Sequence, residues 1–443
     1  MPIPHRDRGA KPPPSPAKVA AASLVGTSLE FYDHFIYGTA AALVFPKLFF
    51  AQNDPRTALL LSLASYGIAF AARPVGAAVF GHFGDRLGRK RVLFITLLVM
   101  GLSTFLIGVL PTYAQAGLFA PAVLALLRLA QGLALGGEWG GAALMVTESG
   151  THRKGLMGSL VQVASPIGFL LANLAFAAVT AALSEEAFLA WGWRLPFLAS
   201  ALLVGVGLYI RHSLDESPEF ELARHEAHAP TQVPLLEVLT RHWGKLLVAV
   251  GARAGSDIAW YVFSLFLTVY LVGIGVPKTV ALQAGMLAAV TQIAAIPFFG
   301  FLADRIGSRK VLALGAVAGM AWAFVFFRMV DSGVPSQIVT ACVVGMFIQA
   351  ALWAPLASFL PDMFPTHVRF TGAGLGFQLA GIAGGAFAPV AALALLNTYG
   401  TSQAVAVYVA VALAFVLMAA VVSGRRRGGD PAGGVHLAPV SRG

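Results

Sequence analysis

Long apolar runs dominate this sequence of 443 residues, and each run is long enough to cross a lipid bilayer. A spanning helix needs about 20 consecutive apolar residues. Only 11% of the residues are charged, against roughly 25% in soluble domains, so the chain cannot supply the polar surface of a soluble protein of this length. We therefore expect an all-α membrane protein. Its twelve spanning helices are predicted at residues 19–46, 57–80, 91–110, 116–144, 155–181, 190–211, 243–273, 279–302, 310–330, 335–359, 368–397 and 401–423.

A short charged motif occurs twice, half a chain apart. Residues 81–93 read GHFGDRLGRKRVL and residues 300–312 read GFLADRIGSRKVL, with six of the thirteen positions identical. A repeat at this spacing indicates two homologous halves, which we expect to be pseudo-symmetric bundles of six helices. Glycine permits a tight turn between helices, and an aspartate can accept hydrogen bonds from a helix N-terminus. We therefore expect gating contacts from the following charged residues of the motif: Asp85, Arg86, Arg89, Asp304 and Arg305.

The two halves and the polar segments between the runs predict the domain organisation. We expect a disordered N-terminal tail, an N-terminal half, a polar linker, a C-terminal half and a disordered C-terminal tail, at residues 1–18, 19–211, 212–242, 243–423 and 424–443.

Lysine and arginine are distributed unevenly between the two sides of the predicted bundle. With twelve spans, 22 of the 30 basic residues fall on the side that carries both termini and only five on the other. Cytoplasmic loops are enriched in lysine and arginine, so this bias predicts that both termini are cytoplasmic. Because the basic residues sit in loops rather than on one soluble face, the net charge of +10 does not indicate a nucleic-acid partner. The first apolar run is long enough to stay in the bilayer, so we expect no cleavable signal peptide.

Ionisable side chains inside the predicted spans are the strongest functional candidates, because a charge at membrane depth is costly unless it is paired or hydrated. In the first span Glu30, Asp33 and Tyr37 have the i, i+3, i+7 spacing of one helix face. Two like charges on one face repel, which favours uptake of a proton by one of the acids. Arg128 and Gln131 reach a similar depth in the fourth span. We favour Asp33 as proton carrier and Glu30 as the partner of Arg128, although the sequence leaves open which acid carries the proton.

The seventh span carries Arg253 and Asp257 one helical turn apart. An i, i+4 pair of this kind can be a structural ion pair or part of a substrate site, and the sequence weighs the two equally. Arg253 or Arg128 is expected to bind a substrate carboxylate, since a guanidinium offers two parallel N–H groups to it. In the fourth span, glycines at four-residue spacing predict close helix packing. Glu138, among these glycines, is a further candidate for proton transfer.

The sequence has no feature of an enzyme or of an ATP-driven pump. No metal-ligand spacing, phosphate-binding loop, nucleophile elbow or dinucleotide motif stands in its proper context. The single cysteine, Cys342, lies in an apolar run, so neither a disulfide nor a thiol metal site is expected. We expect no cofactor and no bound metal. The alternatives to a coupled transporter are a passive facilitator and a polytopic membrane enzyme, and the second would need a reactive cluster that is not visible.

Several stretches together resemble the metabolite:proton symporter family, a bacterial branch of the major facilitator superfamily. They are GTSLEFYDHFIYG at 26–38, RPVG at 73–76, RLAQGLALGGEWGG at 128–141, GWRLPF at 192–197, ESPEF at 216–220 and MFPTHVRFTGAGLGFQ at 363–378. Phe31 and His34 depart from the tryptophan and phenylalanine that are usual at these places in the first motif, and Ala303 and Ser308 make the second copy of the repeated loop differ from the first.

This resemblance implies a twelve-helix fold in the bacterial cytoplasmic membrane and proton-coupled import of a small carboxylate or zwitterion by alternating access. Its partners would be the substrate, the proton and the lipid bilayer, and we expect the monomer to be functional. The short C-terminal tail lacks the coiled coil of the family's osmosensing carriers, which favours a shikimate-like organic acid over proline or betaine.

Overall fold

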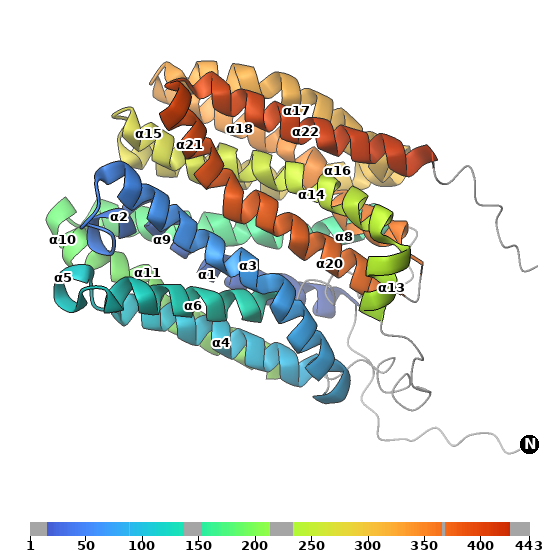
Figure 1. Cartoon of the computed structure of the whole chain (residues 1–443), viewed down its shortest axis with the longest axis horizontal. Coiled ribbons are helices and arrows are strands. Elements are labelled where there is room, and N and C mark those ends of the chain that lie inside the picture. The colour runs from blue at the N-terminus through green and yellow to red at the C-terminus, as the bar shows by residue number, and fades with distance from the viewer. Residues whose placement is uncertain (1–15, 88, 137–152, 213–233, 366–367, 426–443) are drawn as a thin grey trace, which may run out of the picture.

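The computed structural model describes residues 16–87, 89–136, 153–212, 234–365 and 368–425, and in these residues the chain is helical with short connections. The helices lie roughly parallel to one another in one bundle (Figure 1). Apolar helices of this length satisfy their own backbone hydrogen bonds, as a spanning segment must. The expected all-α membrane protein is confirmed.

The first half contributes six spanning segments. They are α1 (Pro16–Leu43), α3 (Pro55–Leu87), α4 (Arg89–Val109), α6 (Phe119–Gly136), α8 (Lys154–Gln162) continued by α9 (Ala164–Ala182), and α11 (Leu195–His212). Short helices connect them: α2 (Phe45–Leu48), α5 (Tyr113–Ala116), α10 (Glu185–Ala190) and the 3₁₀ turn η1 (Gly192–Arg194).

The second half also contributes six segments, two of which contain a π-helical turn. They are α14 (Trp243–Tyr261) with the π-turn η2 (Val262–Phe266) and α15 (Leu267–Gly273), α16 (Lys278–Ile306), α17 (Ser308–Asp331), α18 (Pro335–Trp353) with α19 (Leu356–Phe359), α20 (Arg369–Gly381) with the π-turn η5 (Ile382–Phe387) and α21 (Ala388–Tyr399), and α22 (Ser402–Arg425). The 3₁₀ turn η3 (Pro361–Met363) follows α19.

By length and hydropathy, nine of the described helical segments could cross a membrane on their own, and the apolar stretch Phe94–Val109 is shorter. Helices α1 and α11 complete the bundle by packing on each other and on α4. Pairs of helices from the two halves meet along two seams: α16 lies against α8 and α9, and α3 lies against α20 and η5. A cavity between these seams is therefore lined by both halves.

The repeated motif differs from the expected loop. Helix α3 continues to Leu87 and α4 begins at Arg89, while α16 runs to Ile306 and α17 begins at Ser308. Most of each motif is therefore helix rather than loop. The turn itself is made at Gly307, whose φ of 94° is favourable for glycine alone. We call this end of the bundle the repeat-loop side and the opposite end the far side.

Part of the predicted linker is also helical. Helix α13 (Pro234–Arg241) packs on α14 and α20 with Val238 buried, because an amphipathic helix can cover the ends of neighbouring helices with its apolar face. The remaining domain boundaries stay a prediction.

The glycine spacing in the fourth span has the expected structural role. A side chain at Gly132 would collide with the carbonyl oxygen of Ala69, and one at Gly136 with that of Arg73. Helices α3 and α6 therefore approach until their backbones touch, as stripes of small residues allow. Arg73 of α3 and Arg128 of α6 both contact His34 in the first half.

Candidate functional site

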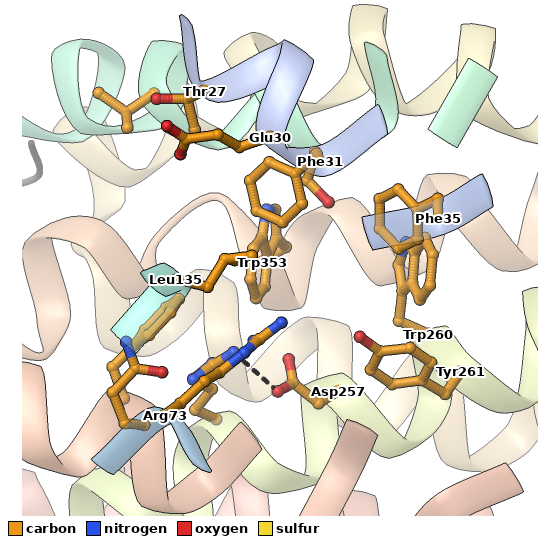
Figure 2. A pocket seen from close by; sticks show the side chains of 15 residues that line it. Thr27, Glu30, Phe31, Phe35, Arg73, Leu135, Asp257, Trp260, Tyr261 and Trp353 are labelled. Atoms are coloured by element: carbon orange, nitrogen blue, oxygen red, sulfur yellow. Dashed lines mark ion pairs between the residues drawn. The ribbon is translucent and has the colours of Figure 1, made fainter. Parts of the chain in front are cut away.

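A small cavity of about 60 Å³ lies between the two halves (Figure 2). Its wall is formed by α1, α3, α6, α8 and α9 from the first half and by α14, α18 and α20 from the second. Four charged side chains line it, namely Glu30, Arg73, Arg253 and Asp257. The rest of the wall is mostly aromatic, with Phe31, Phe35, Trp260, Tyr261, Trp353 and Phe377.

Two arginines line this cavity, and both have donors without a partner among the described residues: Nε of Arg73, and two nitrogens of Arg253. Nη2 of Arg253 lies 3.0 Å from Oδ2 of Asp257, and both side chains are buried. The guanidinium carbon lies 3.2 Å from the ring centroid of Phe377, so the group is stacked on an aromatic face. Its Nε and Nη1 have no hydrogen-bond partner among the described residues. A buried N–H without a partner is costly, so these two donors are ready for an acceptor that enters the cavity.

Arg128 has the opposite character. Its Nη1 donates to Oε1 of Gln131 at 2.9 Å, its Nη2 to Nδ1 of His34 at 3.1 Å and its Nε to the carbonyl of Tyr66 at 3.4 Å. The guanidinium carbon also lies 4.3 Å from the Tyr37 ring centroid. Arg128 is fully buried and does not line the cavity. The expected pairing with Glu30 is not formed, because neighbouring helices of the first half occupy its donors.

The acids of α1 point to different neighbours. Glu30 lines the cavity, whereas Asp33 accepts a 2.6 Å hydrogen bond at Oδ1 from the hydroxyl of Ser200 on α11. Tyr37 makes a 2.8 Å hydrogen bond with Ser65 of α3. Helical spacing placed these residues near one face, but the packing of α3 and α11 against α1 separates their contacts.

His34 is the residue that the sequence interpretation did not include in the site. It is buried, and it contacts Arg73 and Arg128 of the first half and Tyr261 of the second. The sequence signal was present, because His34 is a polar residue inside a span and departs from the family motif. What the sequence could not show is that α3, α6 and α14 all present polar groups to it.

A chain of amide side chains fixes one aromatic wall. Nε1 of Trp260 donates to Gln292 at 3.1 Å, Gln292 donates to Gln349, and Gln349 reaches the Ser256 hydroxyl at 3.3 Å. The Trp260 ring is thereby held stacked on Phe35 of α1, with 5.0 Å between centroids. Sequence reasoning missed both glutamines, since a single polar residue in a span gives no hint of its partner.

One of the residues expected to contribute to gating makes a contact between the halves on the repeat-loop side. The Asp304 carboxylate of α16 accepts from the backbone N–H groups of Gly155, at 2.6 Å, and Leu156, at 2.9 Å, at the start of α8. Arg305 instead lies over the Phe301 ring at 4.4 Å. The side chains of Asp85, Arg86 and Arg89, and all of Glu138, lie outside the described residues.

On the far side the halves are joined through exposed charges. Glu185 lies 3.3 Å from Lys47 and 3.9 Å from Lys278, the first residue of α16. These two lysines lower the pKa of the Glu185 carboxyl, Lys278 contributing most. In the part of the chain that the structure describes, no group of three or more histidine, cysteine, aspartate or glutamate side chains could hold a metal ion.

Family models match both halves of the chain. Residues 18–233 match the model described as "Sugar (and other) transporter", and residues 252–437 match the "Major Facilitator Superfamily". The inner membrane metabolite transport protein YhjE of Escherichia coli K12 is 42% identical, covering 93% of this chain and 94% of that protein. The chain belongs to the major facilitator superfamily.

Other members of the superfamily show how far the likeness extends. The shikimate transporter of Escherichia coli K12 is 38% identical over 88% of this chain and 90% of its own length, and the proline/betaine transporter of the same organism is 33% identical over 83% and 75%. The structure of the xylose transporter XylE from Escherichia coli superposes with a TM-score of 0.71 at 15% identity, covering 92% of this chain and 97% of that one. The superfamily consists of transporters, so the chain is a membrane transporter rather than an enzyme.

Proposed function

We propose that this member of the superfamily imports a small organic acid together with protons across a bacterial inner membrane. The inner membrane is supported by the relative YhjE, which is named an inner membrane metabolite transport protein. The bias of basic residues favours cytoplasmic termini, which would place the repeat-loop side of the bundle in the cytoplasm. The cavity of about 60 Å³ has room for only a few water molecules. Binding a metabolite would therefore require the halves to separate on one side at a time, which is alternating access.

The observation that carries the proposal is the pair of unpartnered N–H groups on Arg253. In a cavity lined by both halves, a stacked guanidinium whose Nε and Nη1 have no partner among the described residues can donate a charge-assisted hydrogen bond to a carboxylate oxygen. Gln378 adds a carbonyl oxygen, Oε1, that has no partner among the residues described and can accept from a substrate hydroxyl. These groups together favour a hydroxylated monocarboxylate such as shikimate.

The function is tested by uptake of radiolabelled shikimate, 2-oxoglutarate, proline and glycine betaine in a host without its own carriers. We expect accumulation of an organic acid that an uncoupler abolishes. Accumulation that survives the uncoupler would indicate a passive facilitator, and uptake of none of the acids would refute the organic-acid assignment.

The role of Arg253 is tested with Arg253→Lys, using Arg328→Lys as a matched control. Lysine keeps the charge but cannot present two parallel N–H groups, so we expect KM for the acid to rise at least tenfold. Arg328 is exposed at the end of α17, away from the cavity, and its substitution should leave KM unchanged.

We further propose that the proton is carried by an acid of α1. The sequence favoured Asp33, whereas the cavity favours Glu30, because Glu30 faces the space that substrate and water can enter. A carrier variant should lose gradient-driven accumulation but keep substrate exchange, which needs no net proton movement. Measuring both activities in Glu30→Gln and Asp33→Asn assigns the role, and full accumulation in both variants would remove α1 from coupling.

A second candidate substrate class is a zwitterion. Aromatic faces such as Trp260 and Trp353 attract a quaternary ammonium group, and Asp257 could balance its charge. The same uptake panel separates the classes, since a betaine carrier would accumulate glycine betaine and ignore shikimate.

A further inference from the structure

A continuous series of hydrogen bonds links the buried arginine of the first half to a tyrosine of the second. Nη2 of Arg128 lies 3.1 Å from Nδ1 of His34, and Nε2 of His34 lies 2.6 Å from the Tyr66 hydroxyl. The Tyr66 hydroxyl in turn lies 3.5 Å from that of Tyr261, which also lies 3.4 Å from Nε2 of His34. Tyr261 lines the cavity and is labelled beside Asp257 in Figure 2.

The direction of these hydrogen bonds follows from the chemistry of the two ends. Arginine carries donors only, so Nδ1 of His34 must accept from Arg128. Arg73 does not distinguish the two ring nitrogens, because its Nη2 lies 3.4 Å from Nδ1 and 3.5 Å from Nε2, so the shorter contact with Arg128 decides. The hydrogen of the neutral imidazole is therefore on Nε2, where it is donated to Tyr66. The opposite tautomer would place an N–H against the N–H of Arg128, which lies 3.1 Å from Nδ1, and would leave Nε2 without a hydrogen for Tyr66.

Each following group then has one remaining role. Tyr66 accepts from His34 and donates its own hydrogen to Tyr261. Tyr261 is an acceptor in both of its hydrogen bonds to described residues, whether the donor is Tyr66 or Nε2 of His34. Its own hydroxyl hydrogen has no acceptor within the part of the chain described here, and the hydroxyl belongs to a residue of the cavity wall.

We propose that His34 is a positioning residue that sets the direction of this series, so that Tyr261 donates a hydrogen bond to an oxygen of the transported substrate. The inference rests on the proposed function for its substrate, a carboxylate or hydroxyl compound. It adds a donor from Tyr261 to the two of Arg253, and it makes His34 of the first half control a substrate contact made by the second.

The tautomer of His34 tests the direction of the series without any substrate. The protein is labelled with ¹⁵N-histidine and purified with a tag that contains no histidine. The chain has ten histidines, so the His34 signals are identified by subtracting the spectrum of His34→Gln. We expect an unprotonated Nδ1 and a protonated Nε2. A protonated Nδ1, in either the other tautomer or the imidazolium, overturns the proposal.

A double-mutant cycle tests whether His34 acts through Tyr261. Using [¹⁴C]shikimate as the probe, Tyr261→Phe removes the donor and should raise KM about tenfold, the cost of roughly one hydrogen bond to a charged group. His34→Leu should raise KM by a similar factor, and the double variant should be no worse than either single one. His34→Gln, whose amide can still donate toward Tyr66, should restore KM to within about threefold.

The matched control is Tyr32→Phe. Tyr32 is a buried tyrosine of α1 whose hydroxyl donates to the carbonyl of Pro196 at 2.8 Å, away from the cavity. Its loss should leave KM unchanged. Multiplicative effects of His34→Leu and Tyr261→Phe, or a fall in protein level with KM unchanged, would overturn the positioning role. If wild-type protein takes up no shikimate, the proposed substrate fails, and the NMR measurement still decides the direction of the series.

Discussion

Arg128 and Arg253 are both buried mid-bundle arginines, yet their surroundings differ in one decisive respect. Arg128 uses all of its nitrogens within the first half, on His34, Gln131 and the carbonyl of Tyr66. Arg253 makes one ion pair with Asp257 and leaves Nε and Nη1 without partners among the described residues. An arginine whose N–H groups all have hydrogen-bond partners stabilises the helices around it, whereas an arginine in a cavity with N–H groups that lack partners can bind a ligand. The comparison therefore supports the proposal that Arg128 is part of the framework and that Arg253 binds the substrate.

The largest expected effect comes from removing each cation in turn. Arg128→Met leaves the buried acceptors on His34 and Gln131 without their donor and should destabilise the protein by about 1–3 kcal/mol for each of them. Removing Arg253 together with its partner, as Arg253→Met with Asp257→Asn, should cost little stability, because both charges of the pair are lost together. The same double variant should reduce uptake at least a hundredfold. Thermal unfolding in detergent and uptake, measured on the same preparations, test both statements.

Equal loss of stability in the two variants would break the comparison. So would normal uptake by the double variant, since it would remove Arg253 from the substrate site.

Glycines that lie against each arginine's neighbours provide a second test. Alanine at Gly136 would collide with the backbone of Arg73 and force α3 and α6 apart, which should cost about 1–3 kcal/mol. Alanine at Gly384, in the π-turn η5, would collide with Cβ of Asp257 and displace the partner of Arg253. We expect Gly384→Ala to raise KM severalfold.

Gly205→Ala is the matched control for both glycine variants, because a side chain there meets nothing within 4 Å. If Gly384→Ala lowered the stability of the protein but left KM at its wild-type value, the surroundings of Arg253 would not differ from those of Arg128 in the way described.

The sequence alone predicted much of this framework, because it depends on local patterns. Apolar runs marked the spans, the repeated motif marked the halves, and glycine spacing marked the contact between α3 and α6. The pairing of Arg253 with Asp257 also follows from i, i+4 spacing on one helix.

What the sequence could not supply is the set of contacts between helices. Asp33 accepts a hydrogen bond from Ser200 of another helix. His34 makes hydrogen-bond contacts with Arg73, Arg128 and Tyr261, which lie on three other helices. These contacts depend on how each helix is rotated about its axis and on which neighbour it meets. A single sequence records neither. It therefore could not show that the nitrogens of Arg128 have hydrogen-bond partners while two nitrogens of Arg253 have none among the described residues.

A smaller effect is expected at the contact between the halves on the repeat-loop side. Asp304→Ala removes the acceptor of the Gly155 and Leu156 N–H groups, and such a cap contributes about 1 kcal/mol. The equilibrium between open and closed states should shift about fivefold, so the maximal rate should change while unfolding and the contacts of Arg253 do not. Initial rates over a range of substrate concentrations test this. A change in KM without a change in rate would contradict a gating role.

The smallest effect is expected at Glu185 on the far side. Its pairs with Lys47 and Lys278 are exposed, and exposed pairs contribute little. Because its pKa is lowered in the folded protein, the small stabilisation is present at neutral pH and is lost as pH falls below the ordinary value of 4.5. Glu185→Gln should change uptake less than twofold at pH 7. A larger change would show that the far-side contact controls the cycle.

The central claim is that the cavity binds the carboxylate of its substrate through the vacant nitrogens of Arg253. An experimental structure of the protein with the acid identified by the uptake panel tests it most directly. We predict an oxygen of the carboxylate within hydrogen-bond distance of Nε or Nη1 of Arg253, while Arg128 keeps its contacts to His34 and Gln131. A substrate bound to Arg128, or bound with Arg253 untouched, would contradict the account.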